Sequence, residues 1–326
     1  MSAAGLAAAD AVEVTVLVDN VSDILSTVPR GVTSEIPNLL RAGAQELSGE
    51  CLCCAHWGLS LLITVHSGAT KQSLLFDAGP EAYAVERNGN RLGLDFGAVS
   101  EMVLSHGHWD HAGGMLAALQ LVRQAGGGPV PIHVNPGMFV TRGMQTPKGD
   151  VVPFRDIPSP QAIAAAGGRV VNDAGARTLL GGGAYLSGEI PRRIAYEKGL
   201  PGHVKREGET WRPDPWILDE RFLAVRLKDK GVVVFTSCSH AGLINVLQHA
   251  RDMFAPEALY GVVGGFHLSG AACEKIIPET VRDLAQFGLQ RIVAGHCTGW
   301  RAIHALLNAF SEDVVWPSAV GRTYRL

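Results

Sequence analysis

A histidine-rich turn constrains this chain more strongly than any other feature. Residues 106–111 read His-Gly-His-Trp-Asp-His. A short apolar run at 101–104 precedes them and predicts a strand, whereas the apolar spacing of 112–124 predicts a helix. The turn is therefore expected at the carboxyl end of a strand, where it can present its side chains at a sheet edge.

The side chains of this turn are those that bind divalent metals. In an extended turn His106 and His108 point to the same side and can bind one ion together. Asp110 and His111 fall where the chain bends into the helix and can face a second ion. Imidazole nitrogens and one carboxylate suit zinc, iron or manganese. The turn therefore predicts a metal site.

Three later histidines follow predicted strands and lie beside small residues. They are His240 after 231–237, His267 after 259–263, and His296 after 291–294. Histidines at the ends of several strands are what a site on one edge of a pair of sheets requires. His249 and His304 instead fall within amphipathic helical stretches, and we expect structural roles for them.

The remaining pattern alternates short β-branched runs with amphipathic stretches. Further strands are predicted at 12–18, 59–65, 73–76, 129–134 and 222–227, and further helices at 242–253, 279–287 and 301–310. Between 135 and 215 glycine, proline and charged residues dominate, and we interpret this part as an elaborated insertion over the site that contains short strands, rather than as a separate domain. The order of elements favours two sheets packed face to face with helices outside.

Composition excludes several classes of protein. Apolar residues make up 47% and charged residues 18% of the 326 residues, as in a globular enzyme. A net charge of -3 argues against a nucleic-acid binder. It does not exclude a small, anionic substrate, which is the expected partner, because a metal can supply positive charge. The Ala-rich residues 1–10 resemble a short disordered lead without a basic region. No run reaches the roughly 20 apolar residues of a membrane helix, so a cytoplasmic location without membrane contact is expected. The sequence leaves open whether the chain forms a homodimer.

The six cysteines do not form the pattern of a disulfide framework in a chain of this length. Cys51, Cys53 and Cys54 are clustered, but no second pair of matching spacing accompanies them. We interpret them as reduced thiols rather than as a metal cluster.

The motifs together resemble a known family. A His-x-His-x-Asp-His turn after a strand is the signature of the metallo-β-lactamase-fold superfamily. Ser-Cys-Ser-His-Ala-Gly at 237–242, Gly-Gly-Phe-His-Leu at 264–268 and His-Cys-Thr-Gly at 296–299 resemble one branch of it. So do Gly-Glu-Ile-Pro-Arg at 188–192 and His-x-Gly-Leu-Ser at 56–60. That branch contains dihydropterin-ribofuranosylaminobenzene-phosphate synthases and phosphodiesterase-like hydrolases.

The resemblance implies an α/β fold, a four-layer αββα sandwich, with residues 1–326 as a single domain carrying the insertion. It also implies two divalent metal ions, with zinc expected and iron or manganese as alternatives. The implied ligands are His106, His108 and His240 for one ion, and Asp110, His111 and His296 for the other.

Two positions depart from the superfamily's commonest pattern. Cys238 stands where an Asp often bridges both metals, so either the thiol is a ligand or only water bridges. No clear histidine between the helix at 112–124 and residue 200 supplies the usual third ligand of the first metal. We assign that role to His240, with His203 as the alternative.

Other residues have expected supporting roles. Asp77 ends the strand 73–76, and in the superfamily such an Asp braces a ligand histidine; an Asx-turn is the simpler interpretation. Glu189 and Arg192 in the insertion either face the substrate, where Arg recognises phosphate, or form an exposed ion pair.

The expected chemistry is hydrolysis by a metal-activated water. A water between two cations loses its proton near neutral pH, and Asp110 can orient it. His267 is the candidate general acid for the leaving group, with a supporting or packing role as the alternative. A phosphodiester or other ester-type bond is the expected target. A pterin-linked transferase, a silent metal- or ligand-binding module and, less well matched, a flavodiiron redox protein are the competing interpretations.

Overall fold

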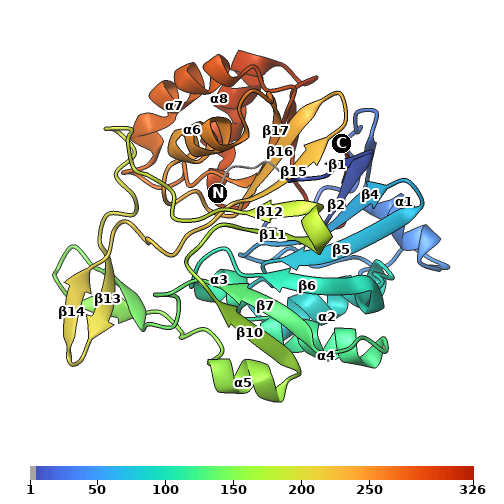
Figure 1. The fold of residues 1–326 in the computed structure, drawn as a ribbon, viewed down its shortest axis with the longest axis horizontal. Coiled ribbons are helices and arrows are strands. Elements are labelled where there is room, and N and C mark those ends of the chain that lie inside the picture. Colours follow the sequence, from blue (N-terminus) through green and yellow to red (C-terminus); the bar gives the residue numbers. More distant parts are fainter. Residues whose placement is uncertain (1–4) are drawn as a thin grey trace.

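The computed structural model describes residues 5–326. Two eight-stranded sheets pack face to face, with helices on the outer side of each (Figure 1). The first sheet has the order β10 (Gly168–Asn172), β7 (Val130–Val134), β6 (Val99–Val103), β5 (Thr70–Phe76), β4 (Ser60–Ser67), β2 (Ala11–Val18), β20 (Thr323–Arg325) and β3 (Val32–Thr33). The second has β11 (Arg177–Leu179), β12 (Ala184–Leu186), β15 (Leu223–Leu227), β16 (Gly231–Thr236), β17 (Leu259–Gly265), β18 (Arg291–Gly295) and β19 (Val315–Pro317), with β1 (Ala8–Ala9) beside β15.

Helices cover both outer faces. The first sheet is covered by α2 (Ala82–Arg91), α4 (Met115–Gln124) and α5 (Pro160–Ala165), and the second by α6 (Leu243–Phe254), α7 (Ile277–Leu284) and α8 (Trp300–Phe310). A short helix, α1 (Glu35–Arg41), packs in a small satellite core. The predicted αββα sandwich is confirmed.

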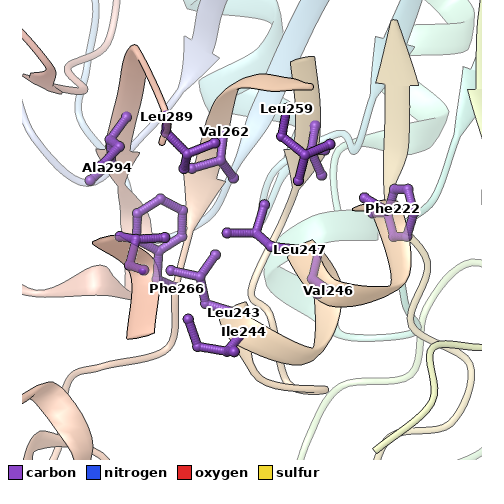
Figure 2. Close-up of a cluster of buried hydrophobic side chains, with 14 of the residues drawn as sticks. Phe222, Leu243, Ile244, Val246, Leu247, Leu259, Val262, Phe266, Leu289 and Ala294 are labelled. Carbon is purple, nitrogen blue, oxygen red and sulfur yellow. The ribbon is translucent and has the colours of Figure 1, made fainter. Parts of the chain in front are cut away.

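The strands of the second sheet are buried on both faces, as β16 shows. Val232 and Val234 pack against the helical layer, whereas Val233 and Phe235 point between the two sheets. Figure 2 shows the helical side of this sheet, where Leu247 of α6 faces Val262 and Leu259 of β17. Each fully buried side chain of this size stabilises the fold by about 1.5–3 kcal/mol. This double burial explains the near-continuous apolar run in the sequence.

Strand direction brings the candidate residues to one end of each sheet. β5 and β6 are parallel in the first sheet, and β16, β17 and β18 are parallel in the second. The loops that follow these five strands carry the predicted site residues. Because the two sheets pack face to face, loops from both meet at the same edge of the sandwich.

Two local expectations need correction. The predicted helix at 112–124 is divided by Gly113 and Gly114 into α3 (Trp109–Ala112) and α4. Of the expected disordered lead, residues 1–4 lie outside the described part, but Ala8–Ala9 pairs with β15 and is ordered. In residues 5–326, no helix has the length and apolar character needed to span a membrane.

The segment at about 135–215 contains short strands, as expected, and the structure shows how they pair. β14 (Thr210–Pro213), β13 (His203–Glu207), β8 (Arg142–Gln145) and β9 (Val151–Pro153) form a third sheet, at one side of the sandwich in Figure 1. Other parts of the segment join the two main sheets as β10, β11 and β12. Its division as an insertion within a single domain stays a prediction.

Candidate metal centre

The histidine-rich turn connects β6 to α3 in a tightly packed loop. His106, His108 and His111 are buried, and Asp110 retains only 8% of its exposure. Gly107 has no space for a side chain, because a Cβ there would collide with the backbone of Met138. Close packing therefore holds the potential ligands of this turn in one arrangement.

Hydrogen bonds determine which nitrogens of His106 and His111 carry lone pairs into the site. Asp77 accepts hydrogen bonds from the backbone N–H and the hydroxyl of Ser105. The Ser105 hydroxyl therefore accepts from His106 Nδ1 at 2.8 Å, which leaves the lone pair on His106 Nε2. Asp77 Oδ2 also lies 2.9 Å from His111 Nδ1, so it orients that ring as predicted.

A second chain of hydrogen bonds sets the tautomer of His108. His203 Nδ1 lies 2.7 Å from the carbonyl oxygen of Asp214, which can only accept, so Nδ1 donates. His203 Nε2 then accepts from His108 Nε2 at 3.0 Å, and the lone pair of His108 is on Nδ1. His203 therefore supports His108 from behind.

The lone pairs of two histidines consequently face each other. His106 Nε2 and His108 Nδ1 are 3.0 Å apart. The His240 ring lies 4.8 Å from the His106 ring, and both of its nitrogens are buried without a hydrogen-bond partner. Buried polar atoms almost always find partners. A cation between these three rings would satisfy all three.

A second group of donors lies on the other side of Cys238. The Cys238 thiol is 3.2 Å from His111 Nε2, and Asp110 Oδ2 is 3.6 Å from both His111 Nε2 and His296 Nε2. Both ring nitrogens of His296 are buried without a hydrogen-bond partner. One donor atom from each of His106, Cys238 and His240 lies within 4.8 Å of the others, and the same holds for His111, Cys238 and His296.

Four of the histidines are held in the neutral form, which favours cation binding. Burial is the main reason why the pKa values of His106, His108 and His240 lie well below their ordinary range. Burial also lowers the pKa of His296 to about 3. Near pH 7 these imidazoles are neutral, which is the form that binds metals.

His111 behaves differently because carboxylates surround it. Burial opposes its charged form, but the charge of Asp110 and the hydrogen bond to Asp77 raise the pKa of His111 to about 9. A proton on Nε2 can then point toward Cys238 and Asp110. Surroundings that stabilise a proton at this atom also stabilise a metal cation in its place.

Backbone strain is concentrated in the same loops. Asp77, Ser239, His267 and His296 all adopt a positive φ, between 44° and 59°. Such conformations cost about 1–3 kcal/mol each and persist where the surroundings enforce them, often at functional sites.

An acidic segment that the sequence pattern does not mark holds the site together. Asp219 accepts from the Gly107 N–H at 2.8 Å and from buried Arg142. Glu220 accepts from the N–H groups of His240 and Ala241 at 2.8 and 2.7 Å. We call residues 219–220 the acidic clip, because it joins the loops of both sheets. Only the partners of these side chains distinguish them from ordinary surface acids.

His267 lies next to the first group but outside it. Its ring centroid is 4.5 Å from that of His240, and its Nδ1 is buried without a hydrogen-bond partner. Its backbone N–H contacts Cys297 Sγ at 3.3 Å. Burial opposes its charged form, but Cys273 and Cys297 raise the pKa of His267 to about 10.

Some predicted residues have other roles. Arg192 donates from both terminal nitrogens to backbone carbonyls of Ile190, Trp216 and Ile217, so the expectation that it faces a phosphate is wrong. Glu189 is exposed. Cys51, Cys53 and Cys54 are free thiols, and none of them is among the clustered donor atoms. Cys51 and Cys53 pack in the satellite core, whereas Cys54 packs against the core between the first sheet and its helices. His249 packs on Phe222, and His304 contacts Asn308 on α8.

A cavity adjoins this centre on the side of His240 and His267. Its volume is about 590 Å³, and it lies between the loop at 195–201 and the chain leading into α7. A smaller space of about 30 Å³, lined by His240 and His267, shares Lys198, Gly199, Cys273 and Ile276 with its walls. We call this smaller space the neck.

Comparison with known proteins agrees with the geometry. Residues 58–217 match the family model of the metallo-beta-lactamase superfamily. Over 259 residues the chain is 30% identical to 7,8-dihydropterin-6-methyl-4-(beta-D-ribofuranosyl)-aminobenzene-5'-phosphate synthase of Methanocaldococcus jannaschii, covering 78% of this chain and 85% of that protein.

Two solved structures share the fold. One is a metal-dependent hydrolase of the beta-lactamase superfamily, with a TM-score of 0.69 and 23% identity over 97% of this chain and 98% of the other. The second is the metallo-beta-lactamase fold protein YhfI from Bacillus subtilis, with a TM-score of 0.52 and 14% identity over 97% of this chain and 100% of the other.

Proposed function

We propose, since this chain belongs to the metallo-beta-lactamase superfamily, that it is a metal-dependent hydrolase of a phosphodiester or other ester-type bond. One observation carries the proposal. The lone pairs of His106 Nε2 and His108 Nδ1 face each other at 3.0 Å beside the unpartnered nitrogens of His240. A buried cation is the simplest group that makes this arrangement favourable.

The donors divide into two sets. His106, His108 and His240 would hold one ion, and Asp110, His111 and His296 the other. Cys238 belongs to both groups and is suited to bridge them. A donor set of imidazole, carboxylate and thiolate suits zinc, with iron or manganese as alternatives. His203 is outside the set because its Nε2 is engaged by His108.

Divalent ions held there would make a water more acidic and place positive charge on the reacting oxygen of the substrate. Asp110 would bind an ion and also orient the water, because its carboxylate lies beside His296 of the second group and keeps some exposure. Asp77 would keep His111 in the required tautomer.

His267 is the candidate proton donor for the leaving group. Its unpartnered Nδ1 lies beside the neck, next to His240, so it can reach a group entering from the cavity. Alternatively, His267 donates no proton and only supports its neighbours Cys297 and His240.

A second candidate function is a pterin-linked synthase reaction. It is favoured by the 30% identity to the Methanocaldococcus jannaschii synthase across 85% of that protein. The same metal ligands would serve a transferase that excludes water. The two candidate functions therefore differ in their substrates rather than in the residues that bind the metal ions.

The test is turnover of a substrate panel by zinc-loaded protein. Bis-p-nitrophenyl phosphate, a lactone and a β-lactam would be compared for wild type and Asp110→Ala, with zinc content measured in both. We expect ester turnover that falls at least about a hundredfold in the variant. No turnover of any ester would favour the synthase if the protein also joined a dihydropterin that carries a leaving group on its 6-methyl carbon to the amine of a ribofuranosylaminobenzene phosphate. The leaving group and one amine proton would be released in that reaction. Unchanged turnover by Asp110→Ala would place catalysis elsewhere.

A further inference from the structure

We propose that the cavity beside His240 is a subsite for an anionic, partly apolar portion of the substrate, bound by Lys198 and Lys275. The anionic group would be a phosphate or a carboxylate remote from the bond that reacts. This inference rests on the proposed function for the identity of the reacting end. The binding of the anion itself does not depend on turnover.

The cavity is placed for a substrate of the candidate metal centre. Its walls continue into the neck through Lys198, Cys273 and Ile276. The neck ends on His240, which is 3% exposed and has both ring nitrogens unpartnered. A ligand in the cavity would therefore point one end at polar atoms that lack a partner.

The volumes of the cavity and the neck indicate which part of a ligand each could hold. About 590 Å³ lies within the usual range for pockets that hold a small organic molecule. The neck, at about 30 Å³, admits only a water or a single small group. The bulk of the ligand would stay in the outer cavity, and only its reacting end would reach His240 and His267.

The charge of the cavity favours an anion. Lys198 comes from the loop at 195–201 and Lys275 from the chain before α7, so the two approach from different walls. Within residues 5–326 neither lysine forms an ion pair. Glu279 is the acidic side chain in the same lining. Two ammonium groups against one carboxylate leave a positive surface.

The neighbouring Glu197 does not offset this charge effectively. It lines the neck, but its two oxygens accept from the N–H groups of Ile244 and Asn245 at 2.7 and 2.8 Å. It therefore serves the first turn of α6. Its burial also raises its pKa to about 7, so part of its charge is neutralised near neutral pH.

Apolar surface lies between the lysines. Ile276 and Pro201 contribute aliphatic surface to the lining. The Tyr196 hydroxyl donates to Asp283 at 2.8 Å, so its ring, rather than its polar end, is available to a ligand. The combination fits a phosphate or carboxylate attached to an aromatic or aliphatic body.

The experiment is a binding titration of metal-free protein with phenyl phosphate, followed by calorimetry. Metal-free protein is used because metal ions would themselves bind the phosphate. Phenylacetate is titrated in parallel to distinguish phosphate from carboxylate, and benzyl alcohol serves as the neutral analogue. The variants are Lys198→Gln, Lys275→Gln and the double variant. Lys71→Gln is the matched control, since Lys71 is an exposed lysine near the amino end of β5, away from the site.

We expect at least one anion to bind wild type and Lys71→Gln equally and more tightly than benzyl alcohol. Each cavity variant should weaken binding by up to about fivefold, as for a partly exposed ion pair, and the double variant by more. Higher salt should weaken binding to wild type. Unchanged affinity in the double variant, or no binding of either anion to wild type, would overturn the proposal. Neither result would contradict the proposed hydrolase function, which is tested separately by turnover of the ester substrates.

Discussion

Cys238 is the residue on which the two candidate metal groups depend together. Its thiol lies 3.2 Å from His111 and belongs with His106 and His240 as well as with His111 and His296. The family resemblance seen in the sequence places Cys238 where an Asp commonly bridges both metals. It leaves open whether the Cys238 thiol is a metal ligand. Its position between the groups favours the ligand role, because no other donor within residues 5–326 belongs to both.

We predict that Cys238→Ala binds less zinc than wild type. Loss of the shared ligand should weaken the second ion by at least about tenfold, whereas three histidines remain for the first. Metal content after equilibrium dialysis against buffered zinc measures this. Cys54→Ala is the control, since Cys54 is a partly buried free thiol that belongs to neither donor group. Equal zinc content in Cys238→Ala and wild type would show that the thiol is not a ligand.

At the scale of secondary-structure elements, the site is formed by loops at the carboxyl ends of parallel strands, held at fixed separation by the acidic clip. The clip lies just before β15, and the next residue, Arg221, donates its N–H to the Ser105 carbonyl at 2.9 Å. Asp219 secures the loop after β6, and Glu220 secures the loop after β16. A segment of adjacent residues thus sets the distance between His106 and His240.

We predict that Glu220→Gln reduces zinc affinity about tenfold, because Gln presents an amide N–H to one of two backbone donors and His240 shifts. Zinc titration of metal-free protein measures the affinity, and urea unfolding measures stability. Glu86→Gln, an exposed carboxylate on α2, is the control. If Glu220→Gln lowered stability alone and left zinc affinity unchanged, Glu220 would be only a structural residue.

At the scale of the whole molecule, the site joins the two sheets of the sandwich. The first sheet supplies His106, His108, Asp110 and His111, whereas the second supplies Cys238, His240 and His296. Ions at this edge would therefore crosslink the two halves of the fold. The third sheet adds His203, on β13, which supports His108.

We predict that zinc raises the melting temperature of the metal-free protein and that a chelator reverses the increase. Ligand bound only to the folded state adds about 2.7 kcal/mol when its concentration is a hundred times its dissociation constant. Calorimetric melting curves with and without zinc measure the shift. His106→Ala combined with His240→Ala should reduce the shift, because only the second group of donors stays complete, whereas His304→Ala, on α8, should keep it in full. A melting temperature independent of zinc in wild type would contradict a metal that joins the sheets.

Local pattern was sufficient where one short segment carries its own signal. The strand at 231–237 and the helix at 242–253 correspond to β16 and α6, because their apolar spacing reflects burial on both faces of a sheet and one face of a helix. The turn at 106–111 was recognisable because its donors are adjacent in the chain. Short strands were expected in the insertion, but their positions and their pairing into a third sheet were not predicted, since they are partly exposed and their pairing partners are distant in sequence.

What the sequence determined by itself was the αββα architecture, the set of candidate metal-binding side chains and the strand ends that carry them. Only the tertiary structure decided how they are used. Cys238 lies between the two groups of donors, and His203 contacts His108 from behind. Arg192 donates to backbone carbonyls, and two lysines line the cavity. These outcomes depend on contacts between residues far apart in the chain, which no local pattern records.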